Sequence, residues 1–294
     1  MRRRLVLALV TVVLDVVVLA GAAHTAVQAY VMAPFEGVGS DGRLTLLFMG
    51  SDSGPPRPGS PLSGRSDGLH IVSLSVDRTR VSIVSFPRDS WVAVAGQGTN
   101  KINACLATGP DACVATVQSL SGIEFDGYML TSFQGFVRGV NAIGGVTVDV
   151  EQRLNDPGGA HSDLQAGVQT LNGDQALSYV RDRHSRPGGD LDRAESHAKF
   201  LKSAHAMLVG QQPSLFRIHQ LVAILHATTV STLSGADQLR LAATGLRIPS
   251  ENVVYQRLGA TLGTVGSASV VFLTDAADAT LADLRADGIL DGVS

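Results

Sequence analysis

The sequence of 294 residues has few charged side chains and no excess of positive charge. Charged residues make up 17% of the chain, and the net charge is −3 at pH 7. General nucleic-acid binders carry a basic surface, so we expect no nucleic-acid partner. The sequence also has no internal repeat. Hydrophobic residues reach 45%, which is enough for a sizeable core in one large domain or two small ones.

Cysteine is nearly absent, since the chain has only Cys105 and Cys113. Two thiols with no histidine close to them are too few for a metal site. An oxidising compartment permits a bond between two such neighbours, and we expect a local disulfide that closes a short loop. Two buried free thiols are the alternative.

One long apolar run stands at the N-terminus. Three arginines follow the first methionine, and residues 5–23 are almost wholly apolar, close to the roughly 20 residues that span a bilayer. The arginines should remain in the cytoplasm, which places the rest of the chain outside the cell membrane as a single-pass protein. Asp15 interrupts the run, at a cost of about 2.5–3.5 kcal/mol if it lies mid-membrane. A cleaved signal peptide is the alternative.

The rest of the chain mixes strand and helix patterns without strict alternation. Strands are expected at residues 44–49, 68–76, 80–86, 128–131, 146–150 and 252–257, and helices at 113–120, 132–143, 173–180, 192–208, 215–229, 234–244 and 275–286. Residues 151–172 are expected to be a loop. The pattern predicts one α/β domain, at 44–294, whose helices cover a mixed central sheet. The cytoplasmic flank and anchor occupy 1–30, and a linker occupies 31–43.

Five arginines stand beside aspartates in four short clusters. The clusters are Arg65-Ser66-Asp67, Arg88-Asp89, Arg181-Asp182-Arg183 and Asp192-Arg193. A guanidinium grips phosphate oxygens with two hydrogen bonds, and neighbouring carboxylates can hold a divalent cation among the same oxygens. Together the clusters predict a diphosphate site with chemistry on the diphosphate. Each one alone is more often a turn or a surface ion pair.

Several of these side chains stand where a strand is expected to end. Asp52 follows the first strand directly, in the region where ligands of α/β folds gather. Pro87 ends the third strand and turns Arg88 outward, and Lys101 follows soon after. These positions suit the binding of a phosphate.

The remaining arginines stand at helix ends. If the chain is extended after the helix at 173–180, Arg181 and Arg183 share one face and invite an anion between them. On a solvated loop, solvent and salt would screen the repulsion between the two guanidinium groups, and no anion would be needed. Arg193 opens the next helix, whose N-terminal end favours anions.

Seven short motifs, in this order, resemble the LytR-CpsA-Psr family of cell-wall glycopolymer transferases. They are residues 46–53 (LLFMGSDS), 65–67 (RSD), 84–89 (VSFPRD), 101–104 (KINA), 144–150 (GGVTVDV), 171–177 (LNGDQAL) and 179–184 (YVRDRH). The resemblance covers about 44–201. It implies an α/β/α catalytic domain that takes a polyprenyl-pyrophosphate-linked glycan and attaches the glycan to peptidoglycan at the membrane. Polyprenyl phosphate would be released, with Mg²⁺ as cofactor.

The resemblance also assigns roles to individual residues. Asp52 and Asp67 match the Mg²⁺-associated carboxylates. The pyrophosphate-binding positions are Arg65, Arg88, Lys101, Arg181, Arg183 and Arg193. Arg88 is expected to be catalytic, and Asp89 or Asp67 would accept the proton of the attacking hydroxyl. Where the family usually has an arginine and a glutamine, this chain has Ser196 and His197.

Two other functions suit the same motifs. The site can cleave a polyprenyl pyrophosphate with water, or it can bind lipid phosphates without turnover as an envelope regulator. The apolar face of the helix at 132–143 fits either a lipid channel or ordinary core packing.

Overall fold

The computed structural model describes residues 25, 29, 35, 42–52 and 64–291. The predicted anchor and linker lie almost wholly outside these residues. Within the described part, no helix is both long enough and apolar enough to cross a membrane. The chain divides into two compact units, Met1–Glu36 and Gly37–Ser294, and the sheet and the site belong to the second.

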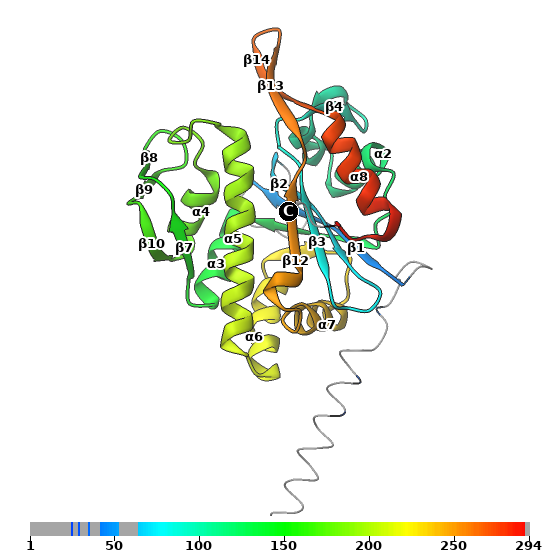
Figure 1. Ribbon diagram of the computed structural model, residues 1–294, viewed down its shortest axis with the longest axis vertical. Coiled ribbons are helices and arrows are strands. Elements are labelled where there is room, and N and C mark those ends of the chain that lie inside the picture. Colours follow the sequence, from blue (N-terminus) through cyan, green and yellow to red (C-terminus); the bar gives the residue numbers. More distant parts are fainter. Residues whose placement is uncertain (1–24, 26–28, 30–34, 36–41, 53–63, 292–294) are drawn as a thin grey trace, which may run out of the picture. The chain divides into compact units, whose positions relative to one another are not determined.

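A six-stranded mixed sheet forms the centre of the second unit (Figure 1). Its strands are β1 (Leu44–Ser51), β2 (Ser66–Leu74), β3 (Val81–Ser85), β6 (Gly127–Ser132), β11 (Thr229–Ser231) and β12 (Val253–Arg257), in the order β11-β6-β1-β2-β3-β12. The pairs β1–β6 and β3–β12 are parallel, and the other three pairs are antiparallel. The predicted mixed sheet is confirmed.

The predicted helices are all present, with bounds that differ by a few residues. They are α2 (Pro110–Ser121), α3 (Phe133–Ala142), α4 (Gly173–Arg181), α5 (Asp190–Gln211), α6 (Leu215–His226), α7 (Gly235–Gly245) and α8 (Asp275–Asp287), with short 3₁₀ helices at η1 (Ile102–Ala107) and η2 (Ser250–Asn252). Ser132 caps α3 as expected, because its hydroxyl accepts a hydrogen bond from the Gly135 N–H at 3.1 Å.

The two faces of the sheet are covered by different helices. Leu47, Ile71 and Val84 point to one face, where they join a buried core with residues of η1, α2 and α8. The disulfide Cys105–Cys113 ties η1 to α2 in this core, so the predicted bridge is confirmed. On the other face, α5 runs beside β12 (Figure 1).

A second core lies among α3, α4, α5 and β7 (Val146–Val150). Val140 of α3 is buried in it, and the Phe136 ring packs against the Phe200 ring with centroids 5.3 Å apart. These contacts support the core-packing interpretation of this helix.

The loop predicted for residues 151–172 is wrong. Three short strands lie there: β8 (Leu154–Asp156), β9 (Ser162–Leu164) and β10 (Gly167–Leu171). β8 pairs with β9, and β10 pairs with β7. The sequence also gave no sign of β4 (Trp91–Val94), β5 (Gly98–Lys101), β13 (Ala260–Val265) and β14 (Ala268–Leu273). The edge strand β11 was missed as well, because its first residue, Thr229, was assigned to the helix predicted at 215–229. The seven other strands that were missed lie outside the central sheet. Six of these seven pair with the strand next to them in sequence, and β10 pairs with β7 across β8 and β9. All seven are stabilised by pairing rather than by a long apolar run.

Candidate active site

Asp67 lies between two guanidinium groups at the β1–β2 end of the sheet. Arg88, placed just beyond β3 by Pro87, donates a hydrogen bond from Nη1 to Asp67 Oδ1. The Nε atom of Arg181 lies 3.9 Å from Asp67 Oδ2. The Arg88 and Asp67 side chains are only 17% and 10% exposed. The structure thus brings together one residue from each of three predicted clusters, far apart in sequence.

Asp89 forms the second part of this cluster. Its carboxylate lies 3.6 Å from Arg88 Nε and 3.2 Å from Lys101 Nζ, and it accepts a hydrogen bond from Asn103 Nδ2 at 3.4 Å. The backbone fixes these groups, because the Asn103 N–H donates to the Arg88 carbonyl at 3.1 Å. The Asp89 carboxylate therefore helps to position the side chains of both Lys101 and Arg88.

Arg181 is the last residue of α4 and lies over an aromatic ring. Its guanidinium carbon is 4.4 Å from the centroid of the Phe133 ring, a cation–π arrangement. The next residue, Asp182, is fully buried and binds the Ser162 and Ser185 hydroxyls, so it shapes the turn rather than the pocket. Among the described residues, no side-chain contact joins Arg183 to the cluster, and its predicted role stays a prediction.

Asp52 directly follows β1 and Arg65 directly precedes β2, so the two residues lie opposite each other at this end of the strand pair. The Arg65 N–H donates to Asp52 Oδ1 at 2.7 Å, and the Asp52 N–H donates to the Arg65 carbonyl at 3.1 Å. Both residues are exposed. Within the described chain, no group of three or more metal-binding side chains is present. Mg²⁺ needs fewer, because it keeps water and phosphate oxygens.

These two carboxylates fit such a metal unequally. One Asp52 oxygen accepts the Arg65 N–H, which leaves the other oxygen available for a cation. Asp67 engages both Arg88 and Arg181, so it fits as a ligand only when the arginines turn to an anion.

Two histidines behind the cluster were missed as site residues. The rings of His70, on β2, and His197, on α5, have centroids 5.7 Å apart. Burial lowers the pKa of His70 to about 4, and burial, His70 and Arg193 lower the pKa of His197 to about 3. His197 Nε2 lies 2.7 Å from the carbonyl of Val180, the neighbour of Arg181. The only sequence signal of this contact was that His197 stands where the family usually has another residue.

Arg193, from the first turn of α5, is 5% exposed. It lies close enough to His197 to lower the pKa of that imidazole, after burial and His70. Tyr255 of β12 fixes the same part of the helix, because its hydroxyl donates to the Ala194 carbonyl at 3.0 Å. Arg193 thus lies on a helix segment that is held to the sheet.

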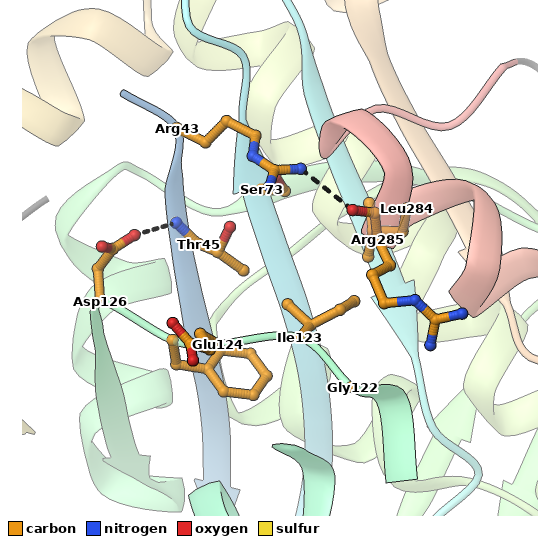
Figure 2. Close-up of a pocket in the computed structure, with 10 residues that line it drawn as sticks. Arg43, Thr45, Ser73, Gly122, Ile123, Glu124, Asp126, Leu284 and Arg285 are labelled. Carbon is orange, nitrogen blue, oxygen red and sulfur yellow. Dashed lines mark hydrogen bonds between the residues drawn. The ribbon is translucent and has the colours of Figure 1, made fainter. Parts of the chain in front are cut away.

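A separate cavity of about 360 Å³ lies at the opposite end of β1 (Figure 2). Arg43, Ser73 and Arg285 are among its lining residues. Both arginines donate to backbone carbonyls: Arg43 to that of Arg285 at 3.4 Å, and Arg285 to that of Ser121 at 3.0 Å. The cavity shares no residue with the Arg88–Asp67 cluster.

Comparison with known proteins gives the family. The LytR_cpsA_psr family model matches residues 17–285. The chain belongs to this family. The chain is 33% identical to an Oceanobacillus iheyensis protein over 168 residues, which are 55% of this chain and 50% of that protein. The relative is named polyisoprenyl-teichoic acid–peptidoglycan teichoic acid transferase TagU. The Corynebacterium glutamicum cell wall biosynthesis protein LcpA is 29% identical over 57% of this chain and 40% of its own length.

The chain thus spans about half the length of these relatives, or less. Solved structures agree on the fold. A Streptococcus agalactiae protein, gbs0355, superposes with a TM-score of 0.73 at 24% identity, over 83% of this chain and 87% of its own. B. subtilis TagV gives 0.70 at 23% identity, over 84% and 96%. The α/β fold with a mixed central sheet is therefore that of the family.

Proposed function

We propose that this LytR-CpsA-Psr protein attaches a polyprenyl-pyrophosphate-linked glycopolymer to peptidoglycan and releases polyprenyl phosphate. The observation that carries the proposal is Asp67, largely buried between the guanidinium groups of Arg88 and Arg181. A phosphate can accept two hydrogen bonds from one guanidinium and carries more negative charge than a carboxylate. The names of the relatives as peptidoglycan transferases support this choice of reaction.

In this reaction the hydroxyl oxygen of a peptidoglycan sugar attacks the phosphorus that carries the glycan. The bond to the bridging oxygen breaks, and polyprenyl phosphate leaves with that oxygen. Arg88 and Arg181 stabilise the charge that spreads over the phosphate oxygens. When the arginines turn to the phosphate, the Asp67 carboxylate is released from its ion pairs with them. Asp89 keeps Lys101 and Asn103, so Asp67 is the better acceptor of the hydroxyl proton.

Mg²⁺ belongs to the same proposal. Asp52, and Asp67 once the arginines have turned, would hold the ion. When bound, Mg²⁺ supplies further positive charge against the diphosphate. The predicted anchor at 1–30 would keep the domain at the outer surface of the membrane, close to its lipid substrate.

The decisive experiment is transfer by the Arg88→Ala variant, with purified lipid-linked glycan and peptidoglycan as substrates. We expect a loss of about 10²- to 10³-fold, the usual effect of removing one preorganised donor. Arg153→Ala is the matched control, because Arg153 pairs with Asp163 on the surface, at 48% and 73% exposure. Unchanged transfer by Arg88→Ala would rule out the role of Arg88. Phosphate release without an acceptor, and no transfer with one, would identify a hydrolase instead.

A further inference from the structure

Arg186, in the loop between α4 and α5, has buried guanidinium atoms that lack a partner. Its Nε and Nη2 atoms make no hydrogen bond within the described chain. The guanidinium carbon lies 5.1 Å from the centroid of the buried Tyr179 ring, which covers one face of the group. A ring satisfies the face of a guanidinium, but the N–H groups in its plane still need acceptors. Buried donors without acceptors are rare, and each one calls for an explanation.

Two described neighbours of Arg186, His197 and Glu151, do not supply the missing negative charge. Burial, His70, Arg193 and Arg186 together lower the pKa of His197 to about 3, so this imidazole is neutral near pH 7. The pKa of Glu151 is lowered first by its hydrogen bond from Lys199 and least by Arg186. Glu151 is 61% exposed and pairs with Lys199, so it is not the acceptor that Arg186 lacks.

The loop that carries Arg186 is held in a defined conformation. The Asp182 carboxylate accepts hydrogen bonds from the Ser185 N–H at 3.1 Å and from the Ser185 hydroxyl at 3.0 Å. On the far side, the Gly188 N–H donates to Asp192 Oδ2 at 2.8 Å. The backbone on both sides of Arg186 is therefore held by hydrogen bonds.

His197 connects this region to the Arg88–Asp67 cluster. Its Nε2 contacts the Val180 carbonyl, and the next residue, Arg181, reaches Asp67. The Ser196 hydroxyl, on the same helix, donates its proton to the Asp192 carbonyl at 2.9 Å, so that proton is not available to a phosphate. Arg186 lies close enough to lower the pKa of His197, so the loop brings a positive charge near the α5 positions, Ser196 and His197, where the family usually has an arginine and a glutamine.

We infer that Arg186 adds a cation to that of Arg193 in a second anion subsite, which takes one phosphate group of a lipid diphosphate. Arg88 and Arg181 take the other. The inference rests on the proposed function, because it needs a donor with two linked phosphates. The class of ligand is a diphosphate monoester or diester, and the acceptors that Arg186 lacks are phosphate oxygens.

The test measures binding of geranylgeranyl diphosphate and geranylgeranyl monophosphate to the full chain by calorimetry. We expect Arg186→Ala to weaken diphosphate binding by about 10-fold or more, the usual size of a charge-assisted hydrogen bond, with little effect on the monophosphate. Arg186→Lys should restore part of the loss. Arg138→Ala is the control, because Arg138 is exposed on α3.

A thermal melt separates this role from a structural one. Removal of a buried cation without a partner should leave the melting temperature of the ligand-free protein unchanged or raised, and should reduce the stabilisation by diphosphate. Three results for Arg186→Ala would overturn the subsite. They are an equal loss of affinity for both lipids, a diphosphate affinity equal to that of Arg138→Ala, and a lower melting temperature without ligand. If Arg88→Ala still weakens binding in that case, the proposed function stands. If the parent protein binds neither lipid, both proposals fail.

Discussion

Asp67→Asn tests how the cluster divides its arginines between carboxylate and phosphate. In the ligand-free protein, Asp67 occupies Arg88 and Arg181, the two groups proposed to bind phosphate. A diphosphate must therefore displace the carboxylate before it can bind both arginines. The amide of asparagine has the same shape without the charge, so the variant removes the competition and leaves the arginines in place.

The magnitude follows from the geometry. Two unit charges about 4 Å apart attract by about 4 kcal/mol at an effective dielectric constant of 20, and the cost of desolvation cancels much of this. We take about 1–2 kcal/mol as the net competition, which corresponds to about 5- to 30-fold tighter diphosphate binding without metal. The loss of Asp67 should also cost about 2 kcal/mol of folding stability, below the usual 3–5 for a broken buried pair. Asp89 remains 3.6 Å from Arg88 and limits that cost.

The assay is calorimetric titration with geranylgeranyl diphosphate, first in EDTA and then in Mg²⁺. The parent should gain affinity when Mg²⁺ is added, and Asp67→Asn should gain less, since it lacks a proposed ligand of the ion. Asp163→Asn is the control, because Asp163 pairs with Arg153 on the surface. Metal-free affinity that is unchanged or weaker in Asp67→Asn would refute the competition between carboxylate and phosphate.

Two further predictions concern stability. The Cys105–Cys113 bond spans a sequence separation of 8, and its reduction should lower the free energy of unfolding by about 2–3 kcal/mol on the loop-entropy relation. Urea denaturation with and without reductant measures this loss, and an unchanged midpoint would contradict it. Burial lowers the pKa of His70 to about 4 and that of His197 to about 3, so the unfolded chain binds more protons below pH 6.5, and stability is lost as pH falls from about 6.5 towards 4. His197→Gln should remove about 3 kcal/mol of the dependence between pH 6.5 and 4 in a series of melts, and the exposed His219→Gln should remove none.

The sequence predicted the parts of the fold that carry a long pattern. The apolar run that became β1 and the helical spacing that became α3 each bury their own stripe, so local pattern and tertiary structure agree. The pair β8–β9 has three residues in each strand, and neither strand carries a recognisable pattern alone. Its stability comes from pairing and from the buried Leu154 and Leu164, which no local window of sequence reports.

The site was predictable in its residue types but not in its pairings. Arg88 and Asp67 stood out through their neighbours, yet their mutual contact depends on the register of β2 against β3. Arg186 escaped notice because its proposed role depends on the burial of its Nε and Nη2 atoms without a hydrogen-bond acceptor. Burial of this kind is a property of the folded state. His197 was visible only as a departure from a family pattern.

The bond between Cys105 and Cys113 has a consequence beyond stability. Cys105 lies in η1, whose Asn103 N–H holds the Arg88 carbonyl, and the bond fastens η1 to α2. The backbone behind Arg88 is thus fastened by a cross-link that the reducing cytoplasm does not maintain. We therefore expect the order of the arginine site to depend on oxidation. With the proposed location outside the membrane, a newly made chain would reach full competence only after export. Maturation would then restrict the proposed chemistry to the compartment that contains the cell wall.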